Sequence, residues 1–168
     1  LKLIFDASHA VGCAYKGGSI ARLGEAHVFS FHATKLLNTF EGGAVVTDRD
    51  DLAAKIRLMK NFGFSGYDSV IYIGTNGKMN EVSAAMGLTG LECLEDLIAA
   101  NRRVYRAYRR ELSGVKGVKL IRYDEKERCN YQYIVLEIDP DEGKISRDRI
   151  VEVLHAETRD AALRPEFV

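Results

Sequence analysis

Short apolar runs alternate with helical patterns along the first part of the chain, and this alternation limits most strongly the folds open to it. The runs at residues 1–5, 26–31 and 44–47 are rich in β-forming residues, and a long helical pattern occupies residues 80–112. Runs of four to eight apolar residues between turns indicate strands, and the 1–5 run indicates a buried one. Strands that alternate with helices predict an α/β architecture.

The second part of the chain has a different pattern, typical of an α+β domain. Three later segments are expected to be regular, namely strands at 118–121 and 131–138 and a helix at 146–155 capped by Ser146. The glycine-rich stretch 63–77 predicts a long surface loop. We expect the boundary to fall within the long helix, which gives domains of residues 1–108 and 109–168.

The charges of this chain of 168 residues balance, with 24 Lys plus Arg against 24 Asp plus Glu. A neutral chain has no broad basic field for nucleic acid or an anionic membrane, so we expect neither as a partner. No apolar run approaches the length of a membrane span. Cys13, Cys93 and Cys129 lack zinc-site spacing, so we expect no metal and reduced thiols, as in a cytoplasmic protein.

Several residues with chemical potential follow the first two strands. Asp6 ends the first apolar run and His9 comes three residues later; alone, each suits a structural role such as a helix cap. Ser30 lies in the second strand, and Lys35 follows it before the run Glu-Gly-Gly at residues 41–43. A lysine among apolar residues is costly to bury as a cation, and desolvation would suit it to covalent binding of a cofactor. A lone lysine is more often an ordinary surface residue. The interpretation that Lys35 binds a cofactor therefore depends on its combination with Asp6, Ser30 and the Glu-Gly-Gly run.

Four segments in order resemble the DegT/DnrJ/EryC1/StrS aminotransferases. They are DASHAVG, FSFHATK, EGGAVVT and GTNGKMNEVSAAMG, and the resemblance covers roughly residues 1–138. It implies an α/β fold of the fold-type I class that uses pyridoxal 5'-phosphate (PLP), with part of the large-domain sheet and the start of a small α+β domain. Family members mostly aminate keto groups of nucleotide-linked sugars, often with glutamate as the amino-acid donor.

The resemblance also implies roles for individual residues. Lys35 matches the catalytic lysine that carries the cofactor, and Asp6 matches the partner of the pyridine nitrogen. His9 stands near the cofactor ring and its 3-hydroxyl, and Ser30 matches a phosphate-binding serine. Asn76 matches an asparagine that reaches the phosphate in the neighbouring subunit, which implies a homodimer with shared active sites.

Departures from the family pattern leave alternatives open. The chain reads Asn-Gly-Lys-Met at residues 76–79, where the family usually has Asn-Tyr-Arg-Met, and residues 157–168 do not resemble the usual continuation. A family segment with a Gly-Thr/Ser phosphate turn finds no match, so we expect a fragment. The alternatives are a PLP-dependent sugar dehydratase, in which histidine replaces the lysine, and a non-catalytic fragment that serves as a binding or scaffold module.

Overall fold

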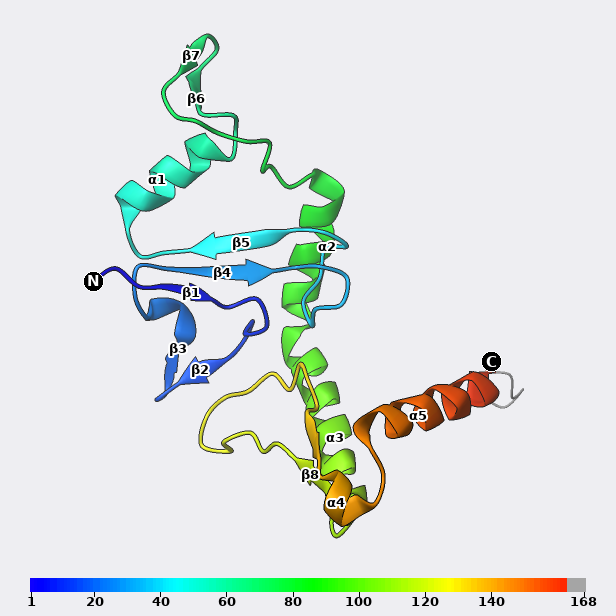
Figure 1. The fold of residues 1–168 in the computed structure, drawn as a ribbon. Helices are drawn as coiled ribbons and strands as arrows, with labels where there is room; N and C mark the ends of the chain where they lie inside the picture. Colours follow the sequence, from blue (N-terminus) through cyan, green and yellow to red (C-terminus); the bar gives the residue numbers. More distant parts are fainter. Residues whose placement is uncertain (163–168) are drawn as a thin grey trace. The chain divides into compact units, whose positions relative to one another are not determined.

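The computed structural model describes the backbone of residues 1–162 (Figure 1). The described chain forms two compact units. Unit 1 contains Leu1–Arg103 together with Tyr123–Gln132, and unit 2 contains residues 104–122 and those from 133 onward. The domain boundary after residue 108 stays a prediction, and the end of its second part, residues 163–168, lies outside the described residues.

Unit 1 is built on a three-stranded sheet with the order β1-β4-β5 (Figure 1). Its strands are β1 (Ile4–Asp6), β4 (Ala26–Ser30) and β5 (Gly43–Val46). Strand β1 runs parallel to β4, with Asp6 opposite Val28, whereas β5 is antiparallel to β4. Because β1 and β4 run in the same direction, their carboxyl ends share one edge of the sheet. The strands expected at 26–31 and 44–47 are therefore confirmed within a residue or two.

The expectation that the first strand is buried is wrong. Ile4 is 65% exposed, and Val28 and Val45 on the neighbouring strands are 42% and 43% exposed. Side chains alternate between the two faces of a sheet, so these three lie on one face. Phe5 and His27 lie on the other face and stack with 4.7 Å between ring centroids. Phe5 is half-buried and His27 is 1% exposed, so the described residues cover these two side chains better than Ile4, Val28 and Val45.

The long helical pattern forms two helices, α2 (Glu81–Glu92) and α3 (Leu94–Glu111), which meet at Cys93. Asn80 caps α2 because its Oδ1 accepts a 2.8 Å hydrogen bond from the backbone N–H of Ser83. Helix α2 packs closely on the loop after β4, since a Cβ added at Gly90 would lie 2.7 Å from Leu37 Cδ1. The prediction of helix over 80–112 is confirmed except for this break.

The rest of unit 1 consists of short elements. They are β2 (Ala14–Tyr15), β3 (Gly18–Ser19), the 3-10 helix η1 (Ile20–Arg22), α1 (Asp50–Met59), β6 (Phe64–Gly66) and β7 (Ser69–Val70). Strands β6 and β7 pair as a hairpin within the stretch expected to be an irregular loop. Strands β2 and β3 form another antiparallel pair. Strands of two or three residues leave little periodicity in the sequence, which is why neither hairpin was expected.

Unit 2 contains an antiparallel pair, β8 (Val118–Leu120) and β9 (Leu136–Ile138), followed by α4 (Pro140–Gly143) and α5 (Arg147–Ala162). Ser146 caps α5 as expected, since its Oγ accepts a 3.2 Å hydrogen bond from the N–H of Arg149. The strand expected from residue 131 begins only at Leu136. No helix among residues 1–162 combines the length and apolarity that a bilayer crossing requires.

Candidate functional site

A pocket of about 480 Å³ opens at the shared carboxyl edge of β1 and β4. Four of the five residues predicted for the site line it: Asp6, His9, Ser30 and Lys35. Ala7, Ser8 and Ala10 complete the lining. The parallel pairing of β1 and β4 brings Asp6 and Ser30 together, and the turns after each strand add His9 and Lys35.

Asp6 is held as a carboxylate by the turn that follows it. The Ser8 hydroxyl donates a 2.5 Å hydrogen bond to Asp6 Oδ1, and the Ser8 backbone N–H donates one of 3.1 Å to the same oxygen. These bonds, in that order, lower the pKa of Asp6; burial opposes them, and the charges of His9 and Lys35 add to the lowering. The pocket therefore presents a negative charge beside a primary amine.

Lys35 lies on the loop between β4 and β5, and it is half-buried. The backbone N–H of Lys35 donates a 2.9 Å hydrogen bond to the backbone carbonyl of His32. Phe31 closes the loop, because its N–H bonds the Gly42 carbonyl and its carbonyl accepts from Thr39 N–H, both at 2.9 Å. The lysine is thus carried by a loop with fixed ends.

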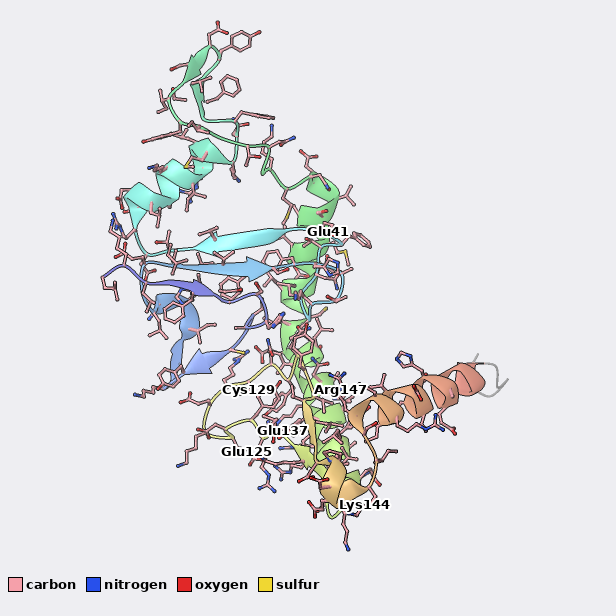
Figure 2. All side chains as sticks on the ribbon, in the orientation of Figure 1. Glu41, Glu125, Cys129, Glu137, Lys144 and Arg147 are labelled. Atoms are coloured by element: carbon pink, nitrogen blue, oxygen red, sulfur yellow. The ribbon has the colours of Figure 1, made fainter. Side chains whose placement is uncertain are left out.

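The two positions after Glu41 require glycine because a larger side chain would not fit at either one. Gly42 has φ 151°, and a Cβ there would lie 2.5 Å from Thr39 Oγ1. A Cβ on Gly43 would lie 2.6 Å from the Phe29 carbonyl oxygen, across the strand pair. Glu41 itself is exposed and lies just before β5 (Figure 2). The Glu-Gly-Gly run therefore shapes the loop that carries the lysine.

Asn76, the fifth predicted residue, does not line the pocket. It is exposed and lies on the segment between β7 and α2. Its backbone forms an isolated antiparallel bridge with Asn61. The role that the family resemblance gives to Asn76 requires a second subunit, so it stays a prediction.

A second pocket, of about 470 Å³, is almost entirely apolar and lies between the sheet and α2. Its lining includes Phe29, Leu37, Val46, Met79 and Leu88. Lacking converging polar groups, it suits packing better than chemistry. No cluster of three or more potential metal ligands occurs among the residues that the structure describes.

Three polar residues at the site were missed from the sequence: Ser8, Asn130 and Gln132. Ser8 bonds Asp6, and the side-chain amides of Asn130 and Gln132 bond the backbone of the two loops that form the pocket. The available signal was an amide pair at the start of a segment expected to be an apolar strand. Such a pair is out of place in a buried strand, because each amide needs partners.

Comparisons with known proteins identify the family of this chain. A model of the DegT/DnrJ/EryC1/StrS aminotransferase family matches residues 1–164, which extends the resemblance beyond residue 138. The chain is 37% identical over 154 residues to dTDP-4-amino-4,6-dideoxy-D-glucose transaminase from Shigella dysenteriae, covering 92% of this chain and 42% of that protein. It thus spans about two-fifths of the length of this relative.

Solved structures give the same result. The crystal structure of DesI in the presence of its TDP-sugar product superposes with a TM-score of 0.87 at 51% identity, over 94% of this chain and 40% of that one. Helicobacter pylori PseC, an aminotransferase involved in the biosynthesis of pseudoaminic acid, gives a TM-score of 0.86 at 28% identity over 94% and 43%. These neighbours are fold-type I PLP aminotransferases, so the expected fold class is confirmed. The chain belongs to the DegT/DnrJ/EryC1/StrS aminotransferase family.

Proposed function

We propose that this chain provides the lysine-bearing part of a PLP-dependent sugar aminotransferase. The enzyme would transfer an amino group from an amino acid, with glutamate as the expected donor, to the keto group of a nucleotide-linked sugar. The observation that carries the proposal is the meeting of Asp6, His9, Ser30 and Lys35 in one pocket. We place the enzyme in the cytoplasm, where nucleotide-linked sugars and reduced thiols coexist.

The residues of the pocket fit PLP chemically. Asp6, whose lowered pKa keeps it ionised at neutral pH, suits a protonated pyridine nitrogen. Lys35 offers a primary amine for covalent attachment, and Ser30 offers a hydroxyl donor for the phosphate. His9 supplies a polar ring on the Asp6 side of the pocket. When bound, PLP supplies an electron sink conjugated to the reacting carbon.

The chain's own residues then divide the remaining work. Lys35 Nζ would hold PLP covalently, and as a free amine it would take up and return the proton that moves during transfer. The Asp6 carboxylate would stabilise the positive charge of a protonated pyridine nitrogen, a role that would serve both halves of the reaction. In the first half the donor would give up its amino group and take up one water to leave as a 2-keto acid, and in the second half the sugar carbonyl oxygen would leave as water when the sugar receives the amino group.

The substrate class is supported by the names of the relatives. A sugar transaminase from Shigella dysenteriae and DesI with its TDP-sugar point to a nucleotide-linked acceptor.

The direct test uses the full-length enzyme. Borohydride reduction of the yellow protein should fix the cofactor on the peptide that contains Lys35; labelling at Lys55 or Lys60 would overturn the assignment. Nucleotide-linked keto sugars are then offered as acceptors beside simple 2-keto acids, with glutamate as donor. Turnover of a keto sugar supports the proposal, and turnover of keto acids alone rejects the sugar. Dehydration of the sugar would favour the dehydratase, and absence of bound cofactor would favour a scaffold module.

We also propose a homodimer in which Asn76 of one subunit reaches the cofactor phosphate of the other. The exposure of the preceding segment supports this, because Tyr67 between β6 and β7 is 97% exposed and Ile73 after β7 is 95% exposed. Large apolar side chains so open to water are typical of surfaces that a partner covers. Asn76 follows them closely in the chain and is itself exposed.

Mixing inactive variants tests the shared site. An Asn76→Ala chain and a Lys35→Ala chain are combined under conditions in which subunit exchange is confirmed by size and label. If the sites are shared, one site of the mixed dimer carries both defects and the other carries neither, so activity returns. Lack of complementation in exchanged dimers would place both residues in the same chain's site.

A further inference from the structure

Gln132 holds the peptide groups on both sides of Lys35. Its side-chain Oε1 accepts a 2.7 Å hydrogen bond from the backbone N–H of Leu36. Its Nε2 donates a 3.0 Å hydrogen bond to the carbonyl of Thr34. One amide side chain, distant in sequence, therefore fixes the backbone immediately before and after the lysine.

Asn130 does the same for the opposite side of the pocket. Its Nδ2 donates hydrogen bonds of 2.8 Å to the His9 carbonyl and 2.9 Å to the Val11 carbonyl. Its Oδ1 accepts a 3.0 Å hydrogen bond from the backbone N–H of Gln132. Asn130 is only 3% exposed, and these bonds use both of its donor hydrogens and its acceptor. We call the side chains of Asn130 and Gln132 the amide brace.

Tyr131, the residue between Asn130 and Gln132, does not have the extended backbone of a β-strand. Tyr131 has φ 53°, in the left-handed region that is costly for a bulky side chain. It is nevertheless buried, with its ring packed edge-on against Tyr123 at 5.0 Å between centroids. This turn lets Asn130 and Gln132 serve two different loops. Cys129 in Figure 2 marks the segment that carries the brace.

We propose that Gln132 is a positioning residue for Lys35, and that Asn130 sets Gln132 and the His9 loop in register with it. A lysine that binds a cofactor and then moves a proton needs its Cα fixed while its long side chain moves. Hydrogen bonds to both adjoining peptide groups achieve this without touching Nζ. The inference rests on the proposed role of Lys35, because positioning matters only if Nζ reacts.

Two substitutions separate the two hydrogen bonds of Gln132. Gln132→Met keeps the length of the side chain and removes both bonds, whereas Gln132→Glu keeps an acceptor for Leu36 N–H and removes the donor to Thr34. We expect hydrogen exchange of the Leu36 amide in the cofactor-free full-length enzyme to accelerate by about tenfold in Gln132→Met and to stay near wild type in Gln132→Glu. Lys126→Met, an exposed position in the same segment, is the matched control and should leave exchange unchanged.

Turnover supplies the second readout. We expect kcat to fall by about tenfold to a hundredfold in both Gln132 variants, while KM for the sugar and the unfolding midpoint stay close to those of Lys126→Met. Wild-type exchange at Leu36 in Gln132→Met, or wild-type kcat in both variants, would overturn the inference. If borohydride labels another lysine in the wild type, the proposed function fails instead, and the exchange data still report whether the brace exists. Should Gln132→Met not fold, Gln132→Glu carries the kcat test.

Discussion

Ser8 Oγ and Asp6 Oδ1 lie 2.5 Å apart, so the residue two positions beyond the strand end holds its carboxylate. The bond favours the ionised form, which is why the pKa of Asp6 lies below its ordinary value. A carboxyl group with a lowered folded-state pKa stabilises the fold fully above its unfolded pKa. This contribution is lost as the pH falls through the folded-state pKa.

Ser8→Ala should therefore raise the pKa of Asp6 toward its unfolded value. Thermal stability should fall at neutral pH, and the difference from wild type should vanish once the solution is acidic enough to protonate Asp6 in both states. Carboxyl-carbon NMR titration reads the pKa directly. An unchanged titration curve in Ser8→Ala would show that the hydrogen bond contributes little in solution.

Asp6→Asn tests the charge itself. The amide is nearly isosteric but cannot stabilise a protonated pyridine nitrogen, so we expect the full-length enzyme to retain much of its cofactor and lose activity by at least about a hundredfold. Absorbance measures the cofactor and turnover of the sugar measures the loss. Asp48→Asn, which changes an exposed carboxylate away from the pocket lining, is the matched control. Near-normal turnover in Asp6→Asn would reduce Asp6 to a structural role.

His27 gives a prediction about stability. It is 1% exposed and stacks on Phe5 with 4° between the ring planes, yet neither ring nitrogen has a hydrogen-bond partner among the described residues. Burying unpaired polar atoms is costly, so His27→Phe should keep the stack and raise the free energy of unfolding by about 1 kcal/mol. His27→Ala, which leaves a cavity, should lower it by about 3 kcal/mol. Urea denaturation measures both, and destabilisation by His27→Phe would reveal a partner for the ring.

The cysteines should differ in reactivity. Burial raises the pKa of Cys13, with partial relief from the Asn130 backbone N–H, and it also raises the pKa of Cys129. A higher pKa leaves less thiolate at a given pH, so both should react slowly with a disulfide reagent at about pH 8 and faster as the pH rises. Exposed Cys93 should react first. Mass mapping of the labelled peptides gives the order, and early labelling of Cys13 would contradict it.

Local patterns predicted the regular elements well because each pattern reports on neighbours in the sequence. The strand at Ala26–Ser30 and the cap at Ser146 needed only periodicity and side-chain chemistry. The burial of the first strand depended on what lies over it, which no local pattern reports. The strand expected from residue 131 failed because Asn130 and Gln132 bond loops instead of a neighbouring strand.

The residues of the candidate site also fall into two groups, those that local sequence patterns predict and those that depend on distant contacts. Asp6 and Lys35 could be proposed from their positions relative to strands and from motifs, and the structure brings them to one pocket. Gln132 could not, because its partners are 96 and 98 positions away in the sequence. Only the course of the whole chain shows that an amide in one segment serves a lysine in another.

The long sequence distance between the two amides and their partners affects the order in which the molecule folds. The bonds from His9 to Asn130 and from Leu36 to Gln132 close loops of 121 and 96 residues. Closing loops of this length slows folding more than it reduces final stability. During synthesis, the sheet that carries Asp6 and Ser30 can pair long before residue 132 leaves the ribosome. The nascent chain therefore presents Lys35 on an unbraced loop, and the pocket acquires its final geometry only when the chain returns from α3.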